Sequence, residues 1–425
     1  MSKRSFFGFM PPKLTYDTIS DAQPEPTAVS PKTKVTLFID APLEKAAEAR
    51  LHIGDGVKRG QKLQLAADAA PYAISPVAGN VMGISPFVGI MERQMTAVTI
   101  EVSGEEADAA FQSQAKSPDM ESAAAFLSKL PGSPDFSRLA PPDGSVKTIV
   151  VLGADTDLLT LTNQYVTQSD IASVKAGIDI LRKISGVQNV VLVVPSHLVQ
   201  TAGSAGAGVK TVADDFPSAH PELIAMDLLG DKLGGQPSRD SAAAFFSAEA
   251  VAAIGRAYES GQIPVNKLVT FVKKDGARQL ISAPVGTHAA DITEAMGETV
   301  NSGDRLVFGG PMNGQAVYTL DHPVQPDTDT ILVQDQAQII EGKDAPCTNC
   351  GECVRVCPTN VPVNELVRYL DAGQYEQAAE AAELYACIEC GYCTYVCESR
   401  IPIFQFIRLA KHALERMKAA EEENA

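Results

Sequence analysis

Tryptophan is absent from this sequence of 425 residues, and histidine and long apolar runs are scarce. No stretch approaches the roughly 18 uninterrupted apolar residues of a membrane-spanning helix, so we expect none. The first seven residues have two positive charges, but Pro11 and Pro12 prevent a long apolar stretch after them, so we expect no secretory signal peptide. The six histidines are scattered without forming a ligand pair, and no G-x-S-x-G nucleophile motif is present. These absences argue against a membrane-spanning protein, a secreted protein and a typical serine hydrolase.

Positive charge is also in short supply, with 35 Lys and Arg against 52 Asp and Glu and a net charge of −17. This balance argues against nucleic acid as a partner and against a polybasic membrane anchor. It fits either docking to a basic partner or simple solubility. Hydrophobic residues make up 45% of the chain, which is enough to build cores, and the length predicts about two to four domains.

Cysteine is absent until position 347 and then occurs in two runs of four. Each run has the spacing C-x2-C-x2-C-x3-C, which is the spacing of bacterial two-cluster ferredoxins. A cubane cluster needs one thiolate per iron. Three come from one run and the fourth from the other. The sequence therefore predicts two [4Fe–4S] clusters with crossed ligands. The first is assigned to Cys347, Cys350, Cys353 and Cys397, and the second to Cys387, Cys390, Cys393 and Cys357.

Two alternatives to iron–sulfur clusters fit the cysteines less well. Zinc sites held by four thiolates usually show paired C-x2-C knuckles rather than four cysteines per run. Disulfides require an oxidising compartment, and we expect no export signal. The clusters in turn require a reducing compartment, so the protein is predicted to be cytoplasmic. Pro358 follows the first run as in ferredoxins, whereas Glu398 takes that place after the second.

The rest of the chain has the pattern of mixed α/β structure. Lys34–Ile39 alternates as a strand should, and residues 33–103 resemble the barrel-sandwich of lipoyl and biotinyl domains. The hairpin tip at residues 66–72 has no lysine, so a swinging-arm function is not expected. Buried strands at residues 148–153 and 189–195, with a helix at residues 170–185 between them, predict a parallel crossover. We expect a third strand at Leu223–Leu228 and a helix at residues 241–258.

Two glycine-rich stretches have both a functional and a structural interpretation. Residues 203–208 do not match G-x-G-x-x-G, so a flexible loop is favoured over a nucleotide loop. Residues 309–314 form either a backbone loop near a cofactor or a tight turn that needs positive φ. After the first cysteine run, residues 363–384 have apolar positions at helical spacing, and residues 403–418 do the same after the second, with Phe406 and Leu409 on the apolar face.

From about Leu37 to Lys411 the chain resembles the C subunit of the Rnf electron transport complex. The order of its parts carries this resemblance, together with the Gly-Gly-Pro-Met turn and the second cysteine run. The same architecture is known in the cobalamin reductase of propanediol microcompartments and, without clusters, in the A subunit of the sodium-pumping NADH:quinone reductase. The α/β region is also similar to the flavin- and NADH-binding subunit of respiratory complex I.

The resemblance implies a multidomain α/β division of the chain. The parts are an N-terminal extension (1–32), a lipoyl-like barrel-sandwich (33–103), a connector (104–146), an α/β flavin-type domain (147–262), a β-grasp-like SLBB domain (263–335), an α-helical ferredoxin-type domain with two clusters (336–418) and an acidic tail (419–425). The extension is expected to wrap a neighbouring domain or to form a partly disordered tail.

The flavin site of the family is altered in this sequence. The usual glycine-rich loop, whose amides cradle the FMN phosphate, corresponds to residues 130–139, where prolines remove amide donors. A second family motif, Asn-Gly-Ala-Glu-x-Glu-Pro, corresponds to residues 152–158, where acidity survives at Asp155 and Asp157 with shorter side chains and the proline is lost. We assign these two residues to a vestigial FMN/NADH site.

Three functions are compatible with these patterns. The leading one is an electron-transfer subunit of an Rnf-type complex, peripheral on the inner face of the cytoplasmic membrane. It would relay single electrons between membrane subunits and a donor or acceptor such as NADH, a ferredoxin or a cytochrome. The second is an NADH dehydrogenase module that contains FMN. The third is a docking protein whose clusters are structural.

Overall fold

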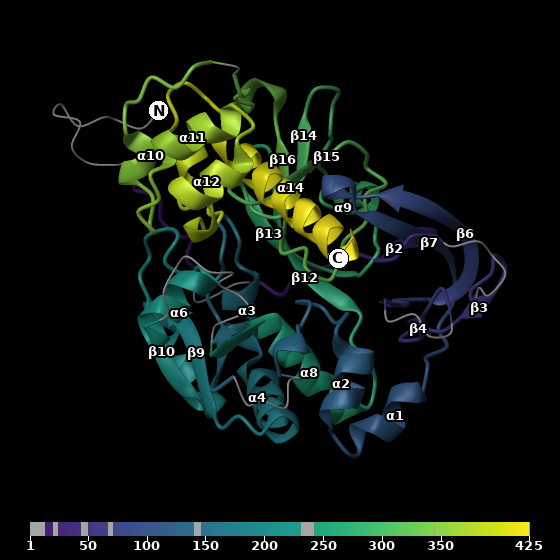
Figure 1. Cartoon of the computed structure of the whole chain (residues 1–425). Coiled ribbons are helices and arrows are strands. Elements are labelled where there is room, and N and C mark those ends of the chain that lie inside the picture. The colour runs from purple at the N-terminus through teal and green to yellow at the C-terminus, as the bar shows by residue number, and fades with distance from the viewer. Residues whose placement is uncertain are drawn as a thin grey trace.

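The computed structural model describes residues 13–19, 24–43, 50–66, 71–139, 146–230, 242–343 and 345–424. These residues form a mixed α/β chain with three larger sheets followed by a helical C-terminal part (Figure 1). Within these ranges, none of the helices has the length and apolarity needed to span a membrane. The mixed α/β, multidomain class predicted from the sequence is confirmed.

The first sheet is antiparallel, with the strand order β2-β7-β6-β3. Alternate residues of β2 are buried, as its sequence predicts. The strands of this sheet are β2 (Lys34–Ile39), β3 (Gly56–Val57), β6 (Ala78–Val88) and β7 (Gln94–Gly104), and a separate pair consists of β4 (Lys62–Leu63) and β5 (Ala73–Ile74). The short 3-10 helix Ile90–Glu92 lies between β6 and β7. Residues 67–70 of the predicted lysine-free hairpin tip lie outside the described residues.

The second sheet is fully parallel, with the strand order β10-β9-β8-β11. Its strands are β8 (Thr148–Leu152), β9 (Asn189–Pro195), β10 (Gly208–Val212) and β11 (Ala243–Ser247), and the helices around it are α1 (Ala110–Ala115), α2 (Met120–Leu127), α3 (Thr162–Ser169), α4 (Ile171–Ser185), α5 (Val199–Ala202), α6 (Pro221–Leu229) and α8 (Ala248–Ser260). Three further 3-10 helices are Ser137–Leu139, Ser196–Leu198 and Gly203–Ala205.

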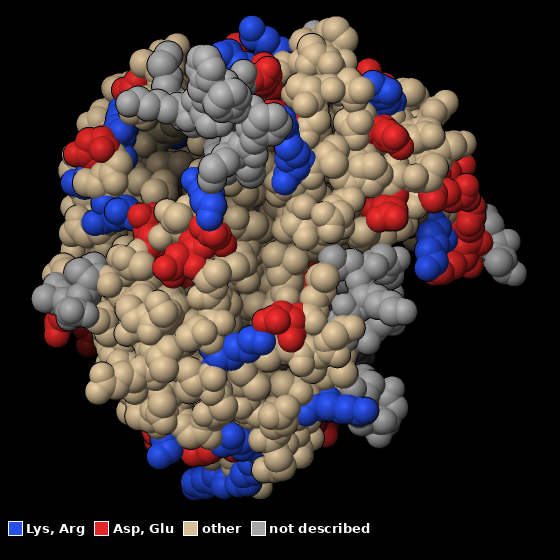
Figure 2. All heavy atoms as spheres, turned by 90° about the vertical axis from the view of Figure 1, so that its left-hand side faces the viewer, with Lys and Arg blue, Asp and Glu red and all other residues tan. Residues whose placement is uncertain are grey.

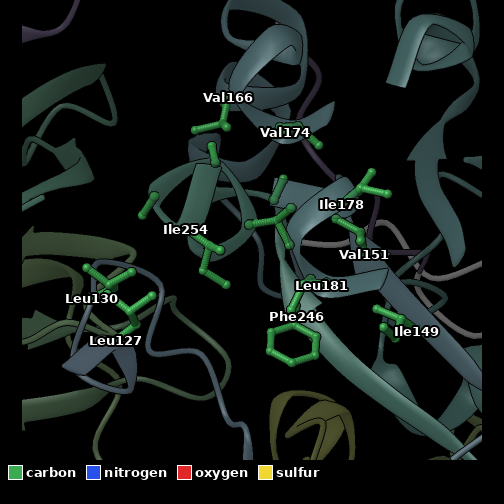
Figure 3. Close-up of a cluster of buried hydrophobic side chains, with 14 of the residues drawn as sticks. Leu127, Leu130, Ile149, Val151, Val166, Val174, Ile178, Leu181, Phe246 and Ile254 are labelled. Atoms are coloured by element: carbon green, nitrogen blue, oxygen red, sulfur yellow. The ribbon is translucent and has the colours of Figure 1, made fainter. Parts of the chain in front are cut away.

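The largest hydrophobic core lies between this parallel sheet and its helices (Figure 3). The predicted helix at residues 170–185 is confirmed as α4, and its Val174, Ile178 and Leu181 are fully buried. These side chains pack in the same cluster as Phe246 of β11 and as Leu130, which follows α2. The predicted crossover from β8 through a helix to β9 is therefore correct.

Two of the predicted elements in this region are wrong. Leu223–Leu228 is not a strand but part of α6, which begins at Pro221 and ends at Gly230 in the left-handed conformation. The remaining strands are instead β10, which begins at Gly208 within the predicted loop, and β11, which replaces the start of the predicted alanine-rich helix. Pairing with the buried strand β8 overrides the helical preference of alanine in β11.

The third sheet is mixed, with the strand order β1-β13-β12-β16-β14-β15. Its strands are β1 (Thr27–Ala28), β12 (Asn266–Val272), β13 (Arg278–Pro284), β14 (Arg305–Phe308), β15 (Gln315–Val317) and β16 (Thr330–Gln334), with helix α9 (Ala289–Ala295) beside them. Because β1 pairs with β13, the described part of the N-terminal extension wraps a neighbouring sheet as predicted. Its earlier residues also form an isolated bridge between Thr15 and Asp215.

A buried charge cluster joins the parallel sheet region to the third sheet. The ammonium of Lys267, on β12, donates to Glu249 of α8 at 2.5 Å and to Asp329 at 2.8 Å. The side chain of Lys267 is 0% exposed, so these carboxylates compensate for its lost hydration. The two carboxylates raise the pKa of Lys267 although burial acts to lower it. This cluster fixes α8 against β12.

The C-terminal part is helical. Its helices are α10 (Glu352–Arg355), α11 (Val363–Asp371), α12 (Tyr375–Ala381), α13 (Tyr392–Val396) and α14 (Ile403–Asn424), with 3-10 helices Gln336–Gln338 and Leu384–Ala386. The predicted helical stretch 363–384 is divided into α11 and α12 at Gly373, which has a φ of 68°. Leu409 is 46% exposed, so its predicted place on the apolar face of α14 is wrong. Helix α14 runs across the molecule (Figure 1) and reaches the first sheet region, where Arg416 pairs with Glu92.

Candidate iron–sulfur centres

The two cysteine runs form a structural repeat with an offset of forty residues. In each run the residue before the second cysteine is left-handed, with a φ of 57° at both Asn349 and Glu389. The glycine after that cysteine is left-handed as well, with a φ of 78° at Gly351 and 76° at Gly391. A short helix then follows, α10 in the first run and α13 in the second. Equal spacing in the sequence therefore gives equal backbone geometry.

The structure gathers three cysteines of the first run with the last cysteine of the second. Cys347, Cys350, Cys353 and Cys397 line one small cavity. Its apolar walls come from residues that begin the following helices, Val363 and Ile403, and from Val367 and Ile401 nearby. This is the same set of four thiols that the sequence assigns to the first cluster.

The remaining four cysteines also lie close together. Burial raises the pKa of Cys387 to about 11 and of Cys390 to about 12, and it raises the pKa of Cys393 as well. The nearby sulfur of Cys357 contributes to the pKa increase in all three. Cys357, from the first run, is thus a neighbour of the second-run thiols. Because burial raises the pKa of Cys387, Cys390 and Cys393, binding of a metal group by these thiols would release protons.

The donor set fits a cluster better than a single ion. Within the described ranges, no group of three or more His, Cys, Asp or Glu side chains is placed to hold one metal ion. Four thiolates around a cubane bind four separate irons, so they surround a larger space than four thiolates on one zinc, where each sulfur lies about 2.3 Å from the metal. The cavity lined by four cysteines has the character that a cubane requires.

The two groups of thiols differ in exposure. Cys350 of the first run is exposed, whereas Cys390 and Cys393 of the second run are buried. On the face shown in Figure 2, lysines and arginines are interspersed with acidic residues, and no single positive patch dominates it. The first group therefore faces outward and the second lies deeper in the molecule.

Aromatic side chains fill the space beside the second run. The Tyr16 and Phe216 rings lie 5.6 Å apart, and Phe216 and Tyr392 lie 5.8 Å apart, between ring centroids. Tyr392 also accepts a hydrogen bond from the amide of Leu14 at 3.3 Å. The N-terminal segment is thus packed against the cluster region. The sequence does not predict this group of aromatic side chains, because nothing in it links residues 14–16 to Tyr392.

The two acids assigned to a vestigial flavin site both accept hydrogen bonds from other parts of the chain. Asp155 accepts from the amide of Asn163 at 2.8 Å and from the side chain of Gln164 at 3.0 Å. Burial raises the pKa of Asp155 to about 7. Asp157 accepts from the amides of Met312 and Asn313, at 3.2 and 2.8 Å, and thereby fixes the turn at residues 309–314. The assignment of these acids to a cofactor site stays a prediction.

The turn at residues 309–314 is tightly packed. A side chain at Gly310 would place its Cβ 2.1 Å from Cγ of Asp157. Met312 in turn closes on the second cysteine run, where a Cβ at Gly391 would lie 2.7 Å from the carbonyl oxygen of Met312. The φ of 93° at Gly309 confirms the interpretation of a tight turn that needs positive φ, and the interpretation of a backbone loop near a cofactor stays a prediction.

The stretch that corresponds to the glycine-rich loop is part of the core. Leu130 is 0% exposed and Phe136 is 1% exposed, and the Phe136 ring lies 6.0 Å from that of Phe246. The amide of Gly132 donates to the carbonyl of Pro326 at 2.7 Å. A Cβ at Gly132 would lie 2.5 Å from the amide nitrogen of Ala250, in the first turn of α8. Gly132 is thus packed closely against the first turn of α8.

Comparison with known proteins agrees with the cysteine geometry. Residues 346–401 match the 4Fe-4S dicluster domain family, so the chain contains an iron–sulfur domain of this class. The C subunit of the proton-translocating ferredoxin:NAD(+) oxidoreductase complex of Clostridium ljungdahlii is 27% identical over 59% of this chain and 57% of its own length. The C subunit of the ion-translocating oxidoreductase complex of Pseudomonas aeruginosa is 25% identical over 80% of this chain and 46% of its own length.

These relatives confirm the predicted resemblance to the C subunit of the Rnf complexes. The chain spans about half the length of the curated relatives it matches. Among solved structures, the H2-reduced NAD+-reducing [NiFe]-hydrogenase matches with a TM-score of 0.47 and 13% identity, over 72% of this chain and 64% of that one.

Proposed function

We propose that this protein is an electron-transfer subunit of a membrane-associated, Rnf-type complex. It relays single electrons through two [4Fe–4S] clusters between membrane subunits and a soluble or cytochrome donor or acceptor. The observation that carries the proposal is the cavity lined by three cysteines of one run and the fourth of the other. The relatives named as subunits of ion-translocating oxidoreductase complexes support the same role.

Crossed ligation assigns the eight cysteines to two clusters. Cys347, Cys350, Cys353 and Cys397 hold one, and Cys387, Cys390, Cys393 and Cys357 hold the other. Because each cluster takes a ligand from both runs, folding of one run depends on the other, and the two clusters lie close together. The protein contributes apolar walls that exclude water, which with hydrogen bonds to sulfur tunes the reduction potentials.

The order of the relay follows from exposure. The cluster at the exposed Cys350 is the one that a partner can approach from solvent. The cluster at the buried Cys390 and Cys393 exchanges electrons with the first cluster. On this account the protein is peripheral on the cytoplasmic face of the membrane, and the division into lipoyl-like, flavin-type, SLBB and ferredoxin-type domains applies to its four main parts.

A flavin is not needed for this function. The acids that the family uses near FMN accept hydrogen bonds from the chain itself here, and Leu130 and Phe136 of the stretch at residues 130–139 are packed into the core. The competing function, an NADH dehydrogenase module with FMN, requires both the acids and the stretch at residues 130–139 to rearrange. The third function, docking with structural clusters, requires that reduced clusters pass electrons to no partner.

One experiment separates these functions. The full chain is purified without oxygen, its extractable flavin is measured, and the visible absorbance of the clusters is followed after NADH and then dithionite are added. We expect no flavin, no bleaching by NADH and full bleaching by dithionite. Bound FMN together with bleaching by NADH would establish the dehydrogenase module instead. Mixing the dithionite-reduced protein with an oxidised bacterial ferredoxin or cytochrome tests the docking function, since a relay passes its electrons on.

A further inference from the structure

The structural repeat of the two cysteine runs contains one electrostatic difference. The left-handed residue before the second cysteine is Asn349 in the first run and Glu389 in the second. The side chain of Asn349 accepts a neutral hydrogen bond from Asn364 at 2.9 Å. The side chain of Glu389 instead accepts from Lys411 at 2.8 Å and lies 3.8 Å from Arg408. Equal backbones therefore present a neutral pair to one candidate cluster and a charged group to the other.

Lys411 makes a second contact that the first run lacks. Its ammonium donates to the backbone carbonyl of Cys387, a second-run cysteine, at 2.7 Å. At the forty-residue offset the equivalent position is Asp371, which is exposed at the end of α11. A cation touches the second-run loop, whereas the matching place of the first run has an acid directed to solvent. The repeat thus creates two binding sites with unequal electrostatic surroundings.

The location of Lys411 allows its charge to act. Its side chain is only 18% exposed, so the surrounding solvent screens it less than a surface charge. Two cations, Lys411 and Arg408, and two acids, Glu389 and Glu222, lie around the loop, and of these the Lys411 ammonium contacts the backbone carbonyl of Cys387. His220 of the neighbouring α/β region adds none near neutral pH, because burial lowers its pKa to about 4. Burial raises the pKa of Glu222, which lies beside His220.

We propose that Lys411 is a positioning residue that raises the reduction potential of the cluster at Cys387, Cys390, Cys393 and Cys357 and leaves the other cluster unaffected. The inference deepens the proposed function and rests on it. Reduction adds one electron, and so one unit of negative charge, to that cluster, with no bond formed or broken and no proton required. A fixed positive charge at the backbone of Cys387 stabilises the added charge. Lys411 therefore favours residence of the electron at the buried end of the relay.

The test is a redox titration of the full chain, purified without oxygen, in which dithionite is the reductant and electron paramagnetic resonance reports each cluster. Changes of the two signals in Cys350→Ser and Cys390→Ser assign them to their clusters. We expect Lys411→Met to lower the midpoint potential of the second-run cluster only. Lys411→Arg should retain a potential close to that of the unmodified protein. Arg416→Met removes a cation five residues further along α14, where the side chain is 66% exposed and paired with Glu92, and it should leave both potentials unchanged.

A second variant distinguishes charge from structure. Glu389→Gln removes the negative partner and should raise the potential of the second-run cluster, opposite in sign to Lys411→Met. If both variants shift the potential in the same direction, or if Lys411→Arg shifts it as far as Lys411→Met, the inference is wrong. If both clusters assemble and neither midpoint potential changes in Lys411→Met, the inference about Lys411 is wrong, but the proposed relay is not contradicted. An iron content of the unmodified protein below about four per chain, which is less than one complete cubane, overturns the proposed function itself.

Discussion

The cysteine runs and the flavin-like corner at the end of β8 use their functional groups in opposite ways. In the cysteine runs, thiols from distant positions line a cavity, and they rely on a bound group for their partners. At the flavin-like corner, Asp155 and Asp157 have their partners within the chain, and Leu130 and Phe136 are buried in the core. Groups that converge on a space without bonding one another indicate a ligand. Groups saturated by the backbone indicate that the same residue types now stabilise the fold.

The largest expected effect is the loss of one iron–sulfur cluster when a cysteine of the runs is replaced. Replacing Cys353 by Ala removes one ligand of the first cluster, whose side chain also belongs to the core of the helical domain. We expect the iron content to fall from about eight to about four per chain, since a cubane holds four irons. Cys397→Ala should affect the same signal as Cys353→Ala in electron paramagnetic resonance, although it lies in the other run. Loss of the other signal would show that ligation is not crossed.

The next effect tests how tightly the flavin-like corner is packed. Gly310→Ala places a methyl group within 2.1 Å of Cγ of Asp157, so the carboxylate must release the turn that it holds. We expect a loss of about 1–3 kcal/mol in the free energy of unfolding, measured by chemical denaturation. The matched control is Gly203→Ala, because a methyl group there meets nothing within 4 Å. Equal stability of the two variants would mean that the corner has room for a ligand after all.

A smaller effect is the pH dependence that the buried Asp155 imposes. Burial raises the pKa of Asp155 from 3.8 to about 7, so the folded chain holds this proton more tightly than the unfolded chain. Its contribution to stability is complete below about pH 4 and is lost as the pH rises to about 7, by at most about 1.4 kcal/mol per pH unit. Asp155→Asn should flatten this slope in denaturation curves. The exposed Asp179→Asn should leave the slope as it is, and a slope unchanged in both variants would contradict the assignment.

The last prediction is that added FMN has no effect on the stability of the protein. A functional flavin site would stabilise the protein by about 2.7 kcal/mol when FMN is present at 100 times its Kd. We expect no shift of the melting temperature with added FMN, because the acids and the residues 130–139 are already engaged. Differential scanning calorimetry with and without FMN measures this directly. A clear upward shift of the melting temperature would show that the flavin-like corner binds FMN, so that both regions hold a bound group.

The sequence predicts the strongly patterned parts of this structure and fails where context decides. The alternation of β2 and the helical period of α4 each match one face of a core, so they are correct. The apolar stretch at residues 223–228 lacks a period that distinguishes a strand from a helix, and only the proline before it and the glycine after it indicate α6. The alanines of β11 favour a helix locally, but the parallel partner β8 makes them a strand.

The same distinction applies to the candidate sites. Cysteine spacing is chemically so restrictive that the sequence alone identifies the four thiols that line the first cavity. Lys411 has no such signal, since a lysine on an amphipathic helix is ordinary until its contact with Cys387 is seen. Asp155 and Asp157 are found by resemblance alone, and the structure shows the hydrogen bonds that now occupy them.

The most direct test of this account is the iron and acid-labile sulfide content of the full chain purified without oxygen. Two cubane clusters predict about eight irons and about eight sulfides per chain. Fewer than about four irons, which is less than one complete cubane, would contradict the relay and with it every function considered for these cysteines.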